Sequence, residues 1–385
     1  MIHKDFLRIY VLWSPDSEEG RRVAELLVGH FDGLGMERDG VAIRVPVRFR
    51  SVPWQGESNP PRDIDLDGAD HNVIVLLHDS LLAESTDIWD QFVSNIRKKF
   101  ADRLYADAYF PFGSPDRDNA LPSDERDHIQ YARRDKWLKV LPSQSERDSR
   151  LLLHLLLSIR KHLKRFYSPG AADEPLFVSH AKADGDTTAR AIVDYVNDTQ
   201  NDVPLQTFYD AMELSPGEDY EERFREEISR GTLLAITSDV YDSRPWCVFE
   251  LTTAKRGYRP IVLADVGLVR TSRTYPYGAN LPKVRLAVTT NPGWIEHLLV
   301  QTLSEGLRCD IFAAQAQKRA TQCGLSSVVF TPRPPELFDL TVGDGTASIM
   351  VYPDPPVGAI EAEILQAALR SSGRSLEFMT LSEVR

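Results

Sequence analysis

The chain has 385 residues, of which 42% are hydrophobic and 26% charged, and its formal net charge is −12. This composition is typical of a globular protein and excludes the disordered and fibrous classes. The length predicts two or three domains. The negative charge argues against a general nucleic-acid binder, because phosphate contacts need clustered Lys and Arg.

Targeting and cysteine features predict a cytoplasmic protein. The N-terminal residues 1–13 lack the long apolar region of a signal peptide, and the apolar stretch 151–157 is far shorter than the ~20 residues that a membrane helix needs. The three cysteines, Cys247, Cys309 and Cys323, form no CxxC pair. Such a sparse, odd set indicates a reducing compartment and predicts neither a disulfide framework nor a structural zinc. We expect no membrane partner and no metal.

The first predicted domain, residues 1–167, alternates strand-like and helix-like segments. Strands are predicted at 7–12, 42–49, 73–77 and 137–141, and helices at 18–31, at 149–166 and from a start within 89–96. Residues 110–135 are rich in Asp, Pro and Arg, which predicts an inserted surface loop. Residues 168–175 have linker composition and mark the boundary of this domain.

The second predicted domain, residues 174–318, contains five strands that alternate with helices. The strands are predicted at 176–179, 205–209, 233–237, 260–264 and 284–288. The helices are predicted from Asp184 or Asp186 to Val196, from Tyr220 to Gly231, from a Ser243 cap to Gly257, and over 294–317. This alternation predicts an α/β fold with a doubly wound, flavodoxin-like parallel sheet. The first domain repeats the plan less clearly, which indicates an internal duplication.

A third region, residues 326–385, has a smaller pattern. Strands are predicted at 327–330, 347–352 and 376–379, with a helix at 360–369. This is a small βαβ-like piece of about 60 residues, which is marginal as an independent core. We therefore expect it to pack on its neighbour.

Three stretches of the second domain resemble the signature motifs of Toll/interleukin-1 receptor (TIR) domains. They are residues 176–180 (LFVSH), 208–210 (FYD) and 243–251 (SRPWCVFEL), in the order found in that family. The resemblance implies a flavodoxin-like fold. It also implies cleavage of NAD⁺ at the ribose–nicotinamide bond, an activity common among bacterial and plant members. The loop from Asp210 to Gly217 corresponds to the family's loop that gates the site and mediates assembly.

By the same resemblance, Glu250 is the catalytic carboxylate, since Trp246 and Glu250 form the family's WxxxE pattern. The cationic nicotinamide ring of NAD⁺ departs from the ribose as a neutral molecule, so the reaction needs no general acid. It needs one carboxylate near the ribose to stabilise an oxocarbenium-like transition state. The candidate substrate-binding residues are Ser179, His180, Lys182, Tyr209, Asp210 and Trp246. The competing interpretation is structural: a solvated helix Glu, a core Trp and solvated loop residues.

The first domain differs from this pattern at the position of the catalytic carboxylate. Aligning Trp89 with Trp246 places Val93 at the position of Glu250. A valine cannot stabilise a developing cation, so we predict a catalytically silent, degenerate TIR-like copy. Its predicted role is regulation or assembly.

The TIR resemblance implies an NAD⁺ hydrolase or cyclase acting in bacterial antiphage immunity or signalling. NAD⁺ is the substrate, so no cofactor is implied. The expected partners are further copies of the chain, through TIR–TIR self-association, and a small-molecule or protein activator. The product stays open between simple NAD⁺ depletion and a cyclic or conjugated ADP-ribose signal. The alternative function is that of a non-catalytic TIR adaptor or scaffold.

Overall fold

The computed structural model divides the chain into two compact units, Met1–Pro169 and Gly170–Arg385. It describes residues 4–33, 43–51, 61–84, 86–113, 130–168, 175–208, 220–267, 278, 280–286, 293–341 and 346–384. Both units are α/β, with parallel sheets and helices between the strands. No helix in these ranges combines the length and the hydropathy needed to cross a membrane.

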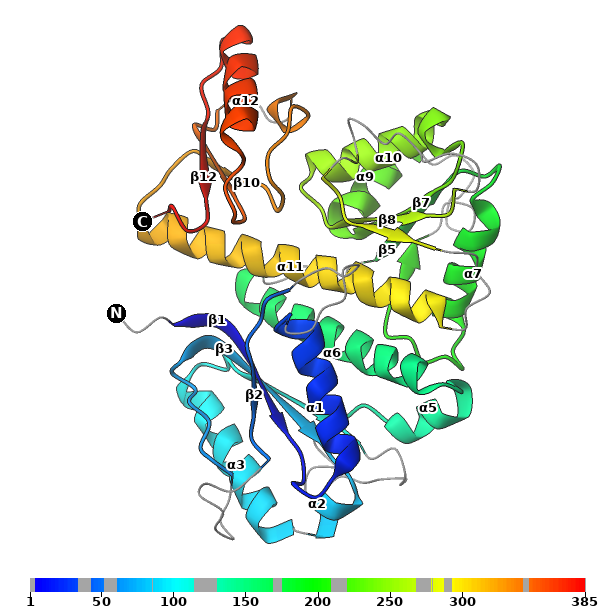
Figure 1. Cartoon of the computed structure of the whole chain (residues 1–385), viewed down its shortest axis with the longest axis vertical. Helices are drawn as coiled ribbons and strands as arrows, with labels where there is room; N and C mark the ends of the chain where they lie inside the picture. The colour runs from blue at the N-terminus through cyan, green and yellow to red at the C-terminus, as the bar shows by residue number, and fades with distance from the viewer. Residues whose placement is uncertain are drawn as a thin grey trace. The chain divides into compact units, whose positions relative to one another are not determined.

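Unit 1 contains a four-stranded parallel sheet with the order β2-β1-β3-β4 (Figure 1). Its strands are β1 (Asp5–Leu12), β2 (Val47–Phe49), β3 (Ala69–Leu77) and β4 (Ala108–Phe112). Its helices are α1 (Glu18–Phe31), α2 (Ser80–Glu84), α3 (Thr86–Asp102), α5 (Arg134–Val140) and α6 (Gln144–Tyr167).

The two central strands of unit 1 are apolar on both faces, as parallel strands covered by helices must be. Alternate residues point to opposite sides of a strand. Tyr10 and Ile74 therefore face Trp89, Phe92 and Val93 of α3 in one buried cluster. Figure 1 shows α1 on the other side of these strands. Helix α3 thus follows the third strand and packs an apolar stripe onto the sheet.

Two predictions for unit 1 were wrong. The predicted strand at 137–141 is α5, because Trp137 and Leu141 are four residues apart and both buried, whereas Leu138 between them is exposed. That is helical spacing. The two ends of the predicted loop at 110–135 are the last residues of β4, where Pro111 interrupts the strand pattern, and the first residues of α5; residues 114–129 lie outside the described residues. In the described part of the sheet β4 is the last strand. Beyond β3 it has an isolated bridge from Phe112 to Ala132, and this edge position tolerates a proline.

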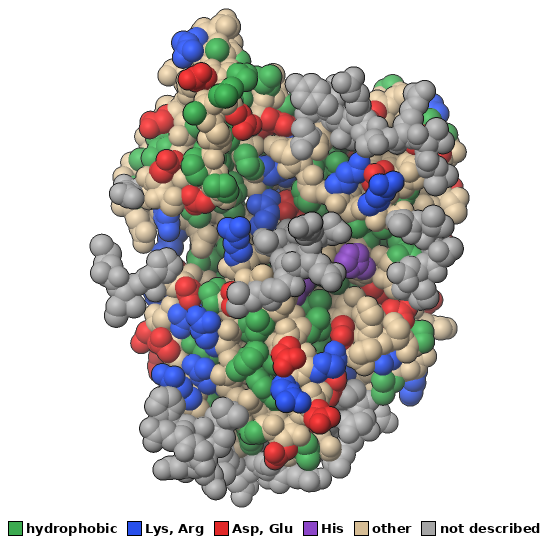
Figure 2. Space-filling view, in the orientation of Figure 1, with side chains coloured by type: hydrophobic (Ala, Val, Ile, Leu, Met, Phe, Trp, Pro, Cys, Tyr) green, Lys and Arg blue, Asp and Glu red, His purple; other side chains and the backbone are tan. Residues whose placement is uncertain are grey.

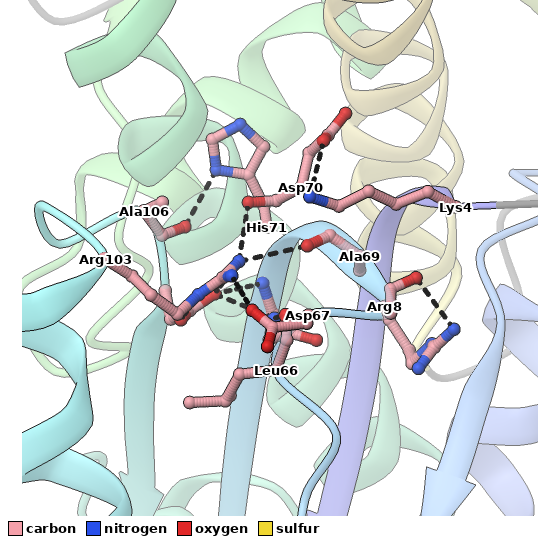
Figure 3. A network of polar contacts seen from close by, with 12 residues as sticks. Lys4, Arg8, Leu66, Asp67, Ala69, Asp70, His71, Arg103 and Ala106 are labelled. Carbon is pink, nitrogen blue, oxygen red and sulfur yellow. Dashed lines mark hydrogen bonds and ion pairs between the residues drawn. The ribbon is translucent and has the colours of Figure 1, made fainter. Parts of the chain in front are cut away.

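The amino end of β3 is fixed by a polar network around Arg103 (Figure 3). The guanidinium of Arg103 donates to Asp107 Oδ2 at 2.6 Å and to the backbone oxygens of Ala69 and Asp70. Asp107 also accepts from the backbone N–H of Asn72 at 2.8 Å. These bonds satisfy buried polar groups at the edge opposite the carboxyl ends of the strands. They set the register between β3 and β4.

Unit 2 contains a five-stranded parallel sheet with the order β6-β5-β7-β8-β9. Its strands are β5 (Leu176–His180), β6 (Thr207–Phe208), β7 (Thr232–Thr237), β8 (Ile261–Asp265) and β9 (Lys283–Arg285). Its helices are α7 (Asp186–Asn197), α9 (Tyr220–Arg230), α10 (Pro245–Arg256) and α11 (Trp294–Gln322), with a short 3₁₀ turn, η2 (Tyr241–Ser243). Apolar side chains of α9 and α10 pack on β5, β7 and β8 in one buried cluster.

The C-terminal region forms a second, three-stranded parallel sheet in unit 2. Its elements are β10 (Val328–Phe330), η3 (Asp339–Thr341), β11 (Ile349–Tyr352), α12 (Ala359–Ser371) and β12 (Glu377–Thr380), and the strand order is β10-β11-β12. The predicted strands and helix of this region are confirmed. We call residues 326–384 the C-terminal module.

Helix α11 connects the two sheets of unit 2, as Figure 1 shows. Its C-terminal half contributes Phe312 and Ala316 to a cluster with Val351 and Val384 of the C-terminal module. The helix is longer than the predicted 294–317 because its last turns pack on this module. On α12, Ile360 and Ile364 are exposed, and Figure 2 shows hydrophobic side chains at the surface over this helix.

Candidate functional site

The candidate site lies at the carboxyl edge of the five-stranded sheet, where β5 and β7 end side by side. Ser179 and His180 are the last residues of β5, and Ser238 directly follows β7. In parallel sheets, ligands bind beyond this edge. The segment from Ser238 to Glu250 continues through η2 into α10, so both signature stretches that the structure describes in full converge here.

Glu250 is buried on α10, with 6% of its surface exposed. Glutamate is seldom buried this deeply without a structural or chemical reason, because transfer of a carboxylate from water is costly. Its charge is close enough to Tyr241 to raise the pKa of that phenol, after burial itself, which is the larger cause. A buried carboxylate therefore sits next to the β5 and β7 ends.

Tyr241 links the helix that carries Glu250 to the end of β5. Its hydroxyl lies 2.7 Å from Ser179 Oγ and donates to the backbone oxygen of Cys247 at 3.4 Å. Because burial raises its pKa well above the ordinary value, the phenol stays neutral and remains a donor. Cys247 in turn donates from Sγ to the backbone oxygen of His180 at 3.4 Å. The first turn of α10 is thus fixed to β5.

The loops after β5 and β7 are joined by Asp184. Its two carboxylate oxygens accept from the Ser238 hydroxyl at 2.5 Å and from the Val240 backbone N–H at 3.2 Å. The sequence predicted Asp184 or Asp186 as the cap of α7, but the N-cap residue is Gly185. Asp184 is therefore a site residue that the sequence did not reveal, since the residues that it contacts are more than 50 positions away in the chain.

His180 is buried and faces the start of α7. Its Nε2 lies 3.4 Å from Asp186 Oδ1, a carboxylate that also accepts from Arg190. Lys182 follows in the exposed loop. Of the three residues predicted where this strand ends, Ser179 and His180 are thus buried and Lys182 is exposed. Tyr209 and Asp210, and the loop to Gly217, lie outside the described residues.

Trp246 is half-exposed, with 51% of its surface accessible, and is not a core residue. Its ring packs edge-on against Phe224 of α9 at 5.9 Å and against Phe249 at 5.5 Å between centroids. It lies four positions before Glu250 on α10, so the two share one side of the helix. The predicted Ser243 cap is wrong. The N-cap residue is Arg244, and the Ser243 hydroxyl donates to the Val240 backbone oxygen.

The equivalent helix of unit 1 has a different character. Helix α3 follows the third strand of its sheet, as α10 follows β7. Trp89 and Val93 are both buried in the cluster between α3 and the sheet, with 7% and 5% of their surfaces exposed. In the sequence alignment of the two tryptophans, Val93 is thus a buried apolar side chain aligned with the Glu250 carboxylate. The side chain of Asp90 lies outside the described residues.

A cavity of about 320 Å³ lies in unit 1, between α1, α5 and α6. The charged groups that line it are largely paired with one another. Arg22 binds both Glu19 and Asp148, at 2.8 and 2.7 Å, and Arg134 lies 3.4 Å from Glu19. These side chains form an internal network. Within the described ranges, no group of three or more His, Cys, Asp or Glu is arranged to hold a metal ion.

Comparison of the chain with models of known protein families finds no match, and no curated protein sequence matches it.

Proposed function

We propose that residues 174–318 of unit 2, which carry the five-stranded sheet, form a TIR-type, flavodoxin-like domain that cleaves NAD⁺ at the ribose–nicotinamide bond, with Glu250 as its catalytic carboxylate. The observation that carries the proposal is the burial of Glu250 on the helix after the third strand, beside Tyr241 and the end of β5. The strand order, second-first-third-fourth-fifth, is that of flavodoxin-like sheets and supports this assignment. Unit 1, with the order second-first-third-fourth, is proposed as the degenerate copy.

The proposed reaction breaks one C–N bond. As nicotinamide departs with the bonding electron pair, positive charge develops on the ribose, and the Glu250 carboxylate stabilises it. Water then adds to the anomeric carbon and releases a proton, giving ADP-ribose. A carboxylate with little water around it stabilises a cation more strongly than an exposed one. Ser179 and His180 are held by Tyr241, Cys247 and Asp186, so they add rigid polar groups at the strand ends.

One observation favours the alternative function, a non-catalytic adaptor. Trp246 presents an exposed aromatic surface, extended by Phe249, whose ring lies 5.2 Å from the guanidinium carbon of Arg225. Aromatic residues and arginine are enriched at protein interfaces. A scaffold that self-associates through this surface would use Trp246 and would have no need of the buried Glu250.

The test is the release of free nicotinamide by purified protein incubated with NAD⁺ over a wide range of protein concentrations. We expect release by the wild type and a loss of roughly a hundredfold or more in Glu250→Gln, which keeps the shape of the side chain but removes its charge. Glu226→Gln, an exposed neighbour on α9, is the matched control and should be active. If no nicotinamide appears at any concentration while Trp246→Ala abolishes self-association, the adaptor function is correct.

A further inference from the structure

The C-terminal end of α10 contacts the C-terminal module. Lys255 lies five residues after Glu250, and its side chain is fully buried. Its ammonium forms an ion pair with the Glu336 carboxylate and lies 5.1 Å from the centroid of the Phe338 ring. A fully buried lysine is rare unless it is paired. Both of its partners belong to residues 331–341, between β10 and the end of η3, which we call the clamp segment.

Further contacts fasten the clamp segment to the same region. Arg333 donates to the backbone oxygen of Arg259, three residues beyond α10, at 3.1 Å. Asn280 donates to the Pro334 oxygen at 2.9 Å, and Arg308 of α11 donates to the Pro332 oxygen at 2.7 Å. The prolines restrict the backbone of the segment, so little conformational entropy remains to be lost on docking.

Charged groups of both signs are buried or half-buried at this interface. Lys255, Arg308 and Arg333 are the cations, and Glu305, Glu336 and Asp339 are the anions. Burial lowers the pKa of Lys255 to about 8, against the opposing charge of Asp339, and burial raises the pKa of Asp339 to about 6. Removing one member of such a set leaves an uncompensated buried charge, whereas replacing a pair by apolar residues of similar volume can be neutral.

A polar contact of this kind suits docking that can be reversed. When the part of the clamp segment around Glu336 detaches, its charges regain water, and Phe338 is the buried apolar side chain that becomes exposed. The apolar cluster of Phe312 and Val351 between α11 and the C-terminal sheet is separate from the clamp segment. The module can therefore stay attached to α11, and Leu340 can stay in the core of the module, while the part of the clamp segment around Glu336 moves.

We propose that the clamp segment positions α10, and with it the Glu250 carboxylate, so that the C-terminal module controls the site. This inference rests on the proposed function. Tyr241 and Cys247 fix the first turn of α10 to β5, and Lys255 fixes the last turn to Glu336. Glu250 lies between these points, about 7.5 Å along the axis from Lys255 at 1.5 Å per residue. Lys255 and Glu336 are positioning residues. A signal that releases the clamp segment would move or loosen the carboxylate.

The kinetic test compares single and paired substitutions in the full chain. Lys255→Met and the milder Glu336→Gln should each lower kcat roughly tenfold to a hundredfold, as expected for a misplaced catalytic group, with the KM for NAD⁺ unchanged. The double variant Lys255→Met/Glu336→Met removes both charges and should recover most of the kcat. The control is Lys318→Met, which replaces a partly exposed lysine on α11 and should leave kcat unchanged.

Hydrogen exchange of the α10 amides at 247–251 tests the positioning without reference to catalysis. Exchange should speed up in both single variants and return toward the wild-type rate in the double variant. Single variants that keep wild-type kcat and wild-type exchange at α10, or a double variant that recovers neither, would overturn the inference. If the wild type releases no nicotinamide, the proposed function fails, and the exchange measurement still decides whether the clamp segment positions α10.

Discussion

Helices α3 and α10 come after corresponding strands of two parallel sheets, but α3 buries apolar side chains and α10 buries a carboxylate. Each follows the third strand of its unit. On α3, Trp89 and Val93 both pack into the core, whereas on α10 the tryptophan is half-exposed and a carboxylate is buried four residues later. An apolar stripe is what packing on a sheet requires. The α10 arrangement departs from it, and such departures are expected at functional sites.

The largest expected difference between the two helices is in their tryptophans. Trp89→Ala removes a buried ring and should lower the free energy of unfolding by about 3–5 kcal/mol. Trp246→Ala removes a half-exposed ring and should cost about 1 kcal/mol. Denaturant unfolding of the full chain measures both, with hydrogen exchange to assign each change to its unit. Equal losses would mean that the two helices do not differ in the way their burial indicates.

The next largest effect concerns the residue after each third strand, which is His78 in unit 1 and Ser238 in unit 2. Burial lowers the pKa of His78 from its ordinary value of 6.5 to about 4. The unfolded chain therefore takes up a proton first as the pH falls, so stability should drop between about pH 6.5 and pH 4, by roughly 3 kcal/mol in total. In His78→Asn this part of the pH dependence should disappear.

Denaturant unfolding at a series of pH values, with hydrogen exchange to follow unit 1, checks this prediction. His30→Asn, on α1, controls for the loss of a histidine elsewhere in the unit. A wild-type stability that is flat from pH 6.5 to pH 4 would contradict the burial of a neutral imidazole at the end of β3.

The smallest effect is expected for Val93→Ala. The loss of two buried methyl groups should lower the free energy of unfolding by roughly 1–3 kcal/mol. Nicotinamide release per folded molecule should stay the same, because the proposed chemistry is at Glu250. The measurement is kcat at a temperature where both proteins are folded. A fall in kcat beyond the folded fraction would show that unit 1 contributes to the reaction.

Local patterns in the sequence predicted most strands and helices of unit 2 and of the C-terminal module. Apolar runs such as 176–179 and 233–237 identify buried strands, and Pro245 and Gly257 bracket α10. The sequence did not predict α2, β4 and α5 of unit 1, and for β4 and α5 the reason is an ambiguous pattern. Pro111 interrupts β4, and the buried pair Trp137 and Leu141 fits a short helix as well as a strand. Short apolar runs allow either interpretation.

The contacts of the site were less predictable than its residues. Ser179 is at the end of β5, as predicted, but its hydroxyl is turned to Tyr241, which is 62 residues away in the chain. The sequence does not indicate a special role for Lys255, since an isolated lysine on a helix is normally solvated. Its burial depends on Glu336 and Phe338, and spacing within α10 gives no sign of them. The spacing of apolar residues along one helix does not predict contacts with residues this far away in the chain.

Because α11 packs on both sheets of unit 2, the two sheets cannot easily be separated into independent domains. The predicted boundary at residue 318 falls inside the helix, which continues to Gln322. Phe312 and Ala316, before that boundary, belong to the apolar cluster of the C-terminal sheet. A chain cut there would leave both sides of the cut with uncovered hydrophobic surface. The C-terminal module therefore cannot be removed without exposing apolar side chains of α11. In any recombination of domains, the five-stranded sheet and the C-terminal module would be inherited together.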